Sequence, residues 1–373
     1  MIGWEDVYKV IVAVVPLYFA LVLGYGSVRW WKIFTREQCD AINKLVCYFT
    51  LPLFAFDFTA HIDPFKMNFL FIGADTLSKL IIVAVIGLWA KCSSKGSSSW
   101  SITSFSLCTL TNSLVVGIPM VKPMYGALGV DLVVQGSVVQ AIVWLTLLLF
   151  VLEFRRTGLE GTISTTSNSL KPKASSISSV MMGEDEERKD LEVNRIGMDV
   201  ILEDGSSKLP FFELMKRVWL KFIVNPNSYA CVVGISWAFI SNRWNLELPS
   251  MVDGCILIMS RAGTGTAMFS MGIFMALQEK VISCGPSLTL FGLVLKFIAG
   301  PAAMAISAIV VGLRGDVLRI AIIQAAIPQS ITSFIFAKEY GLHADVLSTA
   351  VIFGMIVSLP ILVAFYAILE FIH

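Results

Sequence analysis

Two ionisable residues and one amide stand inside otherwise apolar stretches of this sequence. Asp75 and Lys79 are four residues apart, so they share one face of a helix and can form an ion pair. Asn112 stands between Thr111 and Ser113 in a second apolar stretch. Because an ionisable side chain at the centre of a bilayer costs about 3 kcal/mol or more, such residues often line the path of a substrate or an ion. The pattern predicts a transport site within a membrane.

Asn112 marks an interruption of its stretch, and Pro119 follows it. Where a helix is broken, the first N–H groups of the next half-helix have no partner, and together with an amide side chain they favour an anion. A second interruption stands at the matching place in the other half of the chain, at Pro328, Gln329, Ser330 and Ser333. The alternative is an Asn that caps a helix or pairs between helices, and the matching interruption favours the substrate site.

The other polar residues in apolar stretches have two interpretations each. Asp75 and Lys79 form a structural ion pair, or act as a local charge relay, or leave Lys79 to balance a substrate anion. Gln140 is a weaker signal of the same kind. Lys296 is either the counterpart of Lys79 in the second half or a lysine whose amine reaches the membrane interface. Arg261, close to two glycines, predicts a distortion of its helix.

The composition is that of a membrane protein. Hydrophobic residues make up 56% of the chain and charged residues 15%, whereas soluble proteins carry about a quarter charged residues. A spanning helix needs about 20 mostly apolar residues. The apolar halves therefore predict five spans each, at residues 8–28, 41–60, 68–90, 100–121, 131–153, 225–242, 251–277, 284–312, 317–337 and 345–371. A short amphipathic helix at the membrane interface is predicted at residues 211–222.

The charges predict how the spans are oriented. Lys and Arg gather on the side that holds the central segment, so this segment is predicted to be cytosolic and both termini to lie on the opposite side. With five spans each, the halves insert in opposite orientation, as inverted repeats whose broken fourth and ninth helices meet near the midplane. The expected domains are residues 1–154 and 210–373, the second including the interfacial helix. Residues 155–209 join them, and their polar, acidic composition predicts disorder.

No enzymatic or metal-binding pattern stands out. The chain has no G-x-S-x-G, P-loop or H-E-x-x-H sequence, and its cysteines form no C-x-x-C pair. No basic patch is interleaved with aromatic residues, which argues against nucleic-acid binding. We therefore expect no enzyme activity, no cofactor and no metal, and we expect membrane lipid as a partner.

Several long blocks of the sequence resemble the plant PIN-FORMED auxin efflux carriers. They include VPLYFALVLGYGSVRWWKIFTREQCDAIN near the N-terminus, NPNSYACVVGISWAFISNRW at residues 225–244 and AKEYGLHADVLSTAVIFGM at residues 337–355. The blocks follow one another in order along almost the whole chain. The short central segment is similar to that of the short-loop members, which are associated with the endoplasmic reticulum.

The resemblance implies an all-α membrane protein with ten helices in two inverted five-helix repeats, an elevator-type carrier like NhaA and the bile-acid symporters. Spans one, two, six and seven would form a scaffold that mediates a homodimer, and the other six a mobile transport domain. Asn112 would bind the carboxylate of indole-3-acetate or a related auxin, supported by the pair of Asp75 and Lys79. The other implied substrate-binding residues are Gln140 and the apolar Leu51, Ala55, Val115, Leu145 and Ile335.

Four positions depart from the family pattern. Thr111 stands where a proline is usual at the crossing, and Ser333 replaces a second proline after Pro328. In the pocket, Ala55 replaces a common serine and Leu145 a tyrosine. These changes bear on crossing geometry and affinity more than on substrate class.

The expected function is movement of the auxin anion between cytosol and endoplasmic-reticulum lumen, which contributes to auxin homeostasis. The plasma membrane is the less favoured location, and family analogy suggests no obligatory sodium or proton coupling. One alternative is a sodium- or proton-coupled carrier of another organic anion. The other is a membrane protein that binds auxin without moving it.

Overall fold

A computed structural model describes residues 4–92, 97–156, 211–278 and 284–371. Within those ranges the chain is helical apart from turns and short extended connections. The segment predicted to be disordered begins at residue 155, but Arg155 and Arg156 are helical. Its remaining residues, 157–209, lie outside the described residues. The chain divides into two compact units, one made of Met1–Trp144 with Asn225–His373 and the other of Leu145–Val224.

The first part of the larger unit supplies six α-helices and three π-helical turns. These elements are α1 (Trp4–Arg29), α2 (Arg36–Leu45), a π-helical turn (Val46–Thr50), α3 (Leu51–Ala60), α4 (Phe69–Cys92), α5 (Ser98–Thr109), a second π-helical turn (Ser113–Gly117), α6 (Ile118–Val139) and a third (Gln140–Trp144). The second part supplies α10 (Pro226–Trp244), α11 (Ser250–Leu277), α12 (Pro286–Val294), a π-helical turn (Leu295–Ala299), α13 (Gly300–Val311), α14 (Gly315–Ala326), α15 (Ile331–Glu339) and α16 (Ala344–Phe371).

Several helix ends follow directly from local sequence. The Thr35 hydroxyl accepts a hydrogen bond from Gln38 N, and the Gln38 side chain accepts one from Thr35 N, which makes a capping box before α2. Asn225 caps α10 by accepting from Asn227 N. The same helix ends at Asn245, whose left-handed conformation closes the last turn. These signals fix where the spans begin and end.

The helices of the first, second, sixth and seventh predicted spans pack against one another. α1 and α11 touch backbone to backbone, because a Cβ on Gly24 would lie 2.0 Å from the carbonyl oxygen of Phe269. Gly234 of α10 gives similar room to Thr59 of α3. Small residues let helices approach this closely, as is common in membrane proteins.

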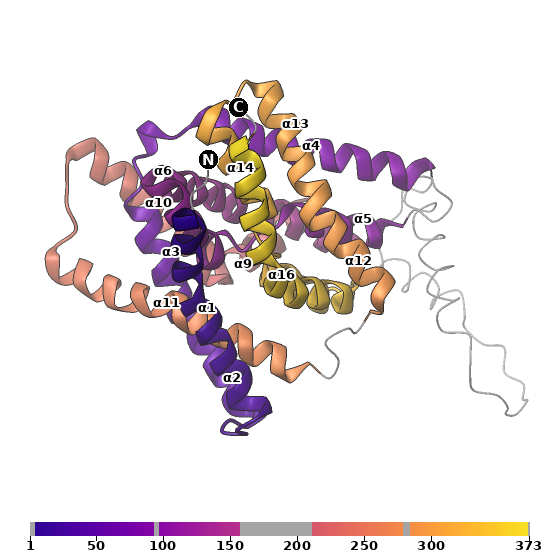
Figure 1. The fold of residues 1–373 in the computed structure, drawn as a ribbon, viewed down its shortest axis with the longest axis horizontal. Helices are drawn as coiled ribbons and strands as arrows, with labels where there is room; N and C mark the ends of the chain where they lie inside the picture. Colours follow the sequence, from indigo (N-terminus) through magenta and orange to yellow (C-terminus); the bar gives the residue numbers. More distant parts are fainter. Residues whose placement is uncertain (1–3, 93–96, 157–210, 279–283, 372–373) are drawn as a thin grey trace, which may run out of the picture. The chain divides into compact units, whose positions relative to one another are not determined.

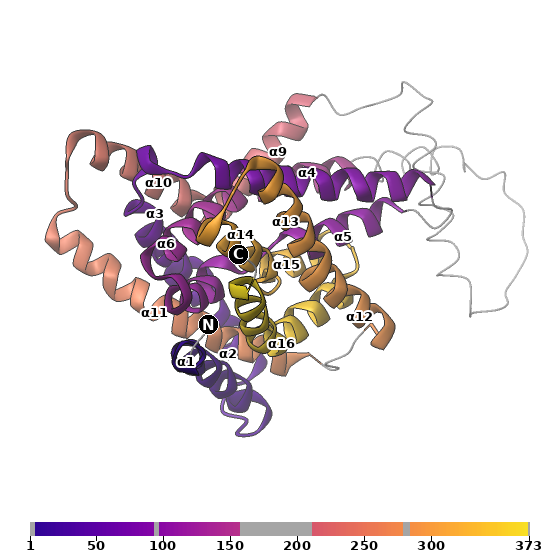
Figure 2. The same ribbon diagram turned by 45° about the horizontal axis from the view of Figure 1, so that its top comes forward.

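The remaining helices of the larger unit form a second group. α13 packs along α4 and α14, while α16 packs against α12, α14 and α15. Figures 1 and 2 both show α3, α10 and α11 toward one side of this unit and α5, α12 and α13 toward the other. The division into a scaffold and a mobile transport domain stays a prediction.

Among the described residues, six helical stretches are long and apolar enough to cross a membrane. They are Tyr8–Arg29, Arg36–Ala60, Phe69–Cys92, Ser113–Arg156, Pro286–Val311 and Ala344–Glu370. α5, α14 and α15 are shorter, with 12, 12 and 9 residues, because the predicted spans four and nine are broken. The all-helical membrane fold is confirmed, and the count of ten spans stays a prediction.

Two local predictions differ from the structure. The predicted loop between spans four and five is replaced by a bend at Gly126, whose φ of 62° a glycine adopts without strain. The distortion predicted at Arg261 is wrong, since α11 is continuous there. Gly263 instead gives room to α3, because a Cβ there would lie 2.8 Å from the Cβ of Phe54.

The smaller unit contains a helix at residues 145–156 and α9 (Phe211–Val224). Of the α9 side chains that the structure describes, Val218 and Phe222 are buried, Lys216 and Arg217 are exposed and Lys221 is partly buried. Within this unit Lys221 Nζ lies 2.7 Å from the buried carboxylate of Glu153. The amphipathic helix predicted at residues 211–222 is confirmed as a helix, and its place at a membrane interface stays a prediction.

Candidate functional site

Both predicted helix breaks are present. α5 ends at Thr109, and the chain is next helical at Ser113. α14 ends at Ala326, and α15 starts at Ile331. The two extended connections lie in the middle of helices that are otherwise apolar, where unpaired backbone groups are costly.

The two breaks cross and satisfy part of each other's backbone. Thr111 and Gln329 form an isolated antiparallel bridge. Two hydrogen bonds flank it, from Asn112 N to Pro328 O (2.9 Å) and from Ser330 N to Leu110 O (3.3 Å). Residues more than 200 positions apart in sequence therefore make one crossing segment, which places the predicted site residues of both halves together.

Asn112 stands at the end of the first break, immediately before the next helix. Its carbonyl accepts from Val116 N and Gly117 N, each at 3.2 Å, so the helix grows from this residue. Among the described residues, its side-chain amide has no hydrogen-bond partner, and the residue is half-buried. An uncommitted amide and a helix N-terminus thus occur at the same point, which is the arrangement expected for an anion site. Pro119 lies about two turns further on, as the second residue of α6.

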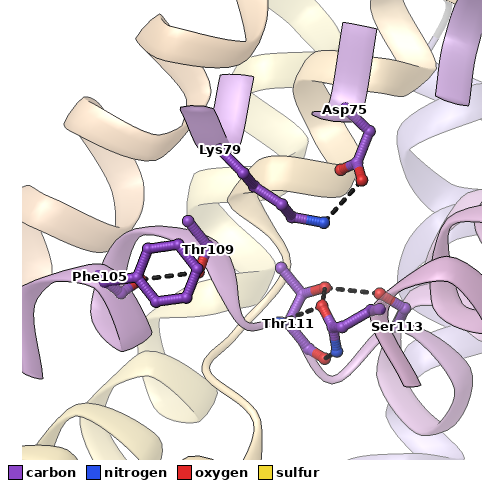
Figure 3. Close-up of polar contacts among 7 residues, drawn as sticks. Asp75, Lys79, Phe105, Thr109, Thr111 and Ser113 are labelled. Carbon is purple, nitrogen blue, oxygen red and sulfur yellow. Dashed lines mark hydrogen bonds and ion pairs between the residues drawn. The ribbon is translucent and has the colours of Figure 1, made fainter. Parts of the chain in front are cut away.

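Asp75 and Lys79 of α4 form the predicted ion pair. Lys79 Nζ lies 2.6 Å from Asp75 Oδ2, and both side chains are almost completely buried (Figure 3). The same amine lies 5.2 Å from the centroid of the Trp144 ring, a distance suited to a cation–π contact. Sequence reasoning missed Trp144, because one more aromatic residue in an apolar stretch gives no local signal.

Gln140 holds the crossing and does not present its amide to open space. Its Oε1 accepts from Thr111 N and from Thr111 Oγ1, both at 3.1 Å, and its Nε2 donates to Thr111 O at 2.8 Å. The Thr111 hydroxyl also lies 2.6 Å from the Ser113 hydroxyl (Figure 3). A proline at position 111 would lack both donors, so the threonine adds contacts that the usual residue cannot make.

The second break is tied to α5 by Gln329. Its Nε2 donates to Ser106 O at 2.9 Å and to the Ser333 hydroxyl at 2.7 Å. The Ser333 hydroxyl donates to Ser330 O at 2.6 Å, and the Ser330 hydroxyl caps α15 by accepting from Thr332 N. These predicted crossing residues therefore hold the second break in place through hydrogen bonds to one another and to α5.

A cavity of about 20 Å³ lies beneath the crossing. Its walls include Asp75, Lys79, Thr111, Gln140 and Gln324. A volume of this size and polarity suits a single water molecule. We conclude that this polar cluster supports the crossing and does not itself enclose an aromatic anion. Gln324 of α14 was not predicted, since it stands alone in an apolar stretch.

The apolar residues predicted to bind the substrate lie in different parts of the structure. Ala55 is buried in a small cluster that also contains Leu114, beside Asn112 in the chain, together with Ala230 and Cys231. Leu51 and Val115 belong to the large central core. Ile335 lies on α15 and is 45% exposed. Leu145 begins the smaller unit, so the structure does not place it relative to the crossing.

Comparisons with known proteins show which proteins this chain resembles. Residues 9–366 match the family described as membrane transport protein. The chain is 68% identical to auxin efflux carrier component 5 of Arabidopsis thaliana, and 60% identical to probable auxin efflux carrier component 5a of Oryza sativa subsp. japonica, over the whole length of each pair. Auxin efflux carrier component 8 of Arabidopsis thaliana is 36% identical over 99% of this chain and 100% of its own.

Proposed function

We propose that this chain, which belongs to the membrane transport protein family and within it to the PIN-FORMED auxin efflux carriers, moves the indole-3-acetate anion between the cytosol and the endoplasmic-reticulum lumen. One observation carries the proposal for the site. The amide of Asn112 has no partner among the described residues and stands at the N-terminal end of the helix that begins at Ser113.

The chemistry of the substrate fits this point of the crossing. A carboxylic acid with a pKa of about 4 to 5 is almost wholly ionised near neutral pH, and the anion crosses lipid poorly. At the crossing, the amide N–H of Asn112 and the free N–H groups of the helix start would donate to the carboxylate. The apolar residues near Leu114 and Ala55 would face the ring system.

The two packing groups support an elevator movement. In this proposal α1, α2, α3, α10 and α11 form a fixed scaffold, through which two copies of the chain form a homodimer. The other helices of the larger unit carry the crossing, and with it Asn112, across the membrane. The tight contacts of Gly24 and Gly234 suit a scaffold that does not change its internal packing.

The proposed location is the endoplasmic-reticulum membrane, with the central segment cytosolic and both termini lumenal. The excess of Lys and Arg on the side of the central segment supports this orientation. Transport there would contribute to auxin homeostasis by changing the cytosolic concentration of the anion. Driving force and direction would follow the gradient, as in a uniporter.

Uptake of radiolabelled indole-3-acetate into proteoliposomes tests this function. We expect saturable uptake that is unchanged when sodium is replaced by potassium or when a pH gradient is removed. Uptake that requires sodium or a proton gradient would favour a coupled carrier of organic anions. Binding without uptake would identify an auxin-binding protein that is not a carrier.

A further inference from the structure

Lys296 occupies the same place in the second repeat as Lys79 in the first. α4 begins at Phe69 and α12 at Pro286, and each lysine is the eleventh residue from that start. Lys296 lies in the π-helical turn Leu295–Ala299, a type of turn that is frequent at functional sites. The equivalence by sequence position is therefore accompanied by an unusual local backbone.

The two lysines differ in their partners. Lys296 is 1% exposed, so its amine does not reach the membrane interface, and its Nζ donates to the carbonyl of Leu110 at 3.3 Å. In the first repeat, Asp75 stands four residues before Lys79. In the second, Gly292 stands four residues before Lys296. Among the described residues, no carboxylate forms an ion pair with Lys296.

The acceptor of this hydrogen bond is part of the crossing. Leu110 caps the C-terminal end of α5 and is two residues before Asn112, and its carbonyl also accepts from Ser330 N. The helix that carries Lys296 approaches α5 closely, because a Cβ on Gly300 would lie 2.6 Å from Cys108 O. A cation at a helix C-terminus offsets the negative end of the helix dipole. Lys296 thus contacts the crossing at the C-terminal end of α5.

The charges around the crossing do not cancel. Asp75 and Lys79 compensate each other, whereas a protonated Lys296 has, among the described residues, a neutral carbonyl and no carboxylate as its hydrogen-bond partner. A buried charge without a counter-charge is costly. An anion bound beside Asn112 would lower that cost, whereas a neutral ligand of the same shape would not.

We propose that Lys296 is a positioning and selectivity residue for the transported anion. Through Leu110 it holds the crossing segment, and its uncompensated charge selects a carboxylate over a neutral ligand. This inference rests on the proposed function, because it places the carboxylate beside Asn112.

The experiment introduces a carboxylate that compensates the charge of Lys296 and keeps the lysine in place. Gly292→Asp gives Lys296 a carboxylate four residues away, as Asp75 does for Lys79. A Cβ at Gly292 meets nothing closer than 3.8 Å, so there is room for one. Gly292→Asn is the matched neutral control. Lys296→Gln keeps a donor for Leu110 O but removes the charge, and Lys296→Arg keeps the charge.

Binding of indole-3-acetate and of the neutral indole-3-acetamide is measured on purified full-length proteins whose thermal unfolding is recorded. We expect Gly292→Asp and Lys296→Gln to weaken indole-3-acetate binding about tenfold, as for unit charges about 10 Å apart at an effective dielectric constant of about 20. Indole-3-acetamide binding should stay within about twofold of wild type in every variant. Gly292→Asn and Lys296→Arg should bind both ligands like wild type.

Three outcomes overturn the inference. If Gly292→Asp and Lys296→Gln bind indole-3-acetate like wild type, the charge has no role. If both ligands weaken equally, Lys296 is only structural. The comparison does not depend on Lys296→Gln: if that variant does not fold, Gly292→Asp and Gly292→Asn still separate a role of the Lys296 charge from a purely structural role. Wild-type protein that fails to bind indole-3-acetate contradicts the proposed function itself, and with it this inference.

Discussion

The side chain of Gln140 forms hydrogen bonds with both backbone polar groups of Thr111. Gln140 Oε1 accepts from Thr111 N at 3.1 Å, and Gln140 Nε2 donates to Thr111 O at 2.8 Å. Thr111 lies between two helices, so its backbone N–H and C=O have no helical partners. The Gln140 side chain pairs with both groups, as the backbone of a neighbouring β-strand would. Both residues are buried, so water does not compete for these groups. The relationship makes Gln140 a structural part of the crossing.

Replacing Gln140 by Leu should destabilise the protein. The substitution leaves the N–H and C=O of Thr111 buried without partners on this side, and each such group costs about 1–3 kcal/mol. We expect a lower unfolding temperature in detergent and a loss of uptake. Gln140→Glu, which keeps an acceptor for Thr111 N but loses the donor to Thr111 O, should fall between wild type and Gln140→Leu. If Gln140→Leu has the same unfolding temperature as wild type, the hydrogen bonds between Gln140 and Thr111 do not stabilise the fold.

Asp75 and Lys79 should be energetically coupled. Asp75→Asn leaves the Lys79 amine buried beside Trp144 without its counter-charge, and breaking a buried pair costs about 3–5 kcal/mol. Each single substitution should therefore reduce uptake and thermal stability. The double substitution Asp75→Asn with Lys79→Met should lose less than the sum of the single losses. Strictly additive losses in the double-mutant cycle would mean that the two residues have separate roles.

Much of this site could be predicted from the sequence, because its main features are local. The i, i+4 spacing of Asp75 and Lys79 is enough to predict their contact on a helix. The breaks at residues 110–112 and 327–330 are visible because polar residues and proline interrupt apolar runs there. The matching places of the two breaks in the two halves then predicted that they meet near the midplane.

The partners of the buried amides and amines could not be predicted in the same way. Gln140 meets Thr111 across 29 positions, and Lys296 meets Leu110 across 186. Such contacts depend on how helices pack, and no local periodicity encodes that packing. For the same reason, the two interpretations of Lys296, counterpart of Lys79 or residue reaching the interface, were separated only by its burial and its hydrogen bond.

The proposed location in the endoplasmic reticulum can be tested in plant cells. A fluorescent protein inserted into the central segment, between residues 158 and 209, should label the endoplasmic reticulum. Export of radiolabelled auxin from these cells should fall, because the anion is sequestered in the lumen. Surface labelling with increased export would disprove the location and leave the carrier assignment intact.

The orientation of the chain can be checked in sealed microsomes whose cytosolic face is outward. Added protease should cut within residues 158–209 and release two large membrane-bound fragments. The positive-inside rule is the physical reason, since Lys and Arg gather on the side of this segment. Cleavage that appears only after detergent is added would reverse the topology.

The central claim is that Asn112 binds the carboxylate of the transported anion. Its side chain makes no hydrogen bond among the described residues, so Asn112→Ala should leave the unfolding temperature close to that of wild type. A hydrogen bond to a charged group contributes about 1.5–3 kcal/mol, so we expect indole-3-acetate binding to weaken at least about tenfold. Asn245→Gly, which removes an asparagine at the left-handed end of α10, serves as the matched control.

The most direct measurement is calorimetric titration of indole-3-acetate into purified wild type, Asn112→Ala and Asn245→Gly. On this assignment, wild type and Asn245→Gly bind with the same affinity, and Asn112→Ala binds at least about tenfold more weakly while remaining folded. Equal affinity of folded Asn112→Ala and wild type would contradict it, and the carboxylate would then have to bind elsewhere in the chain.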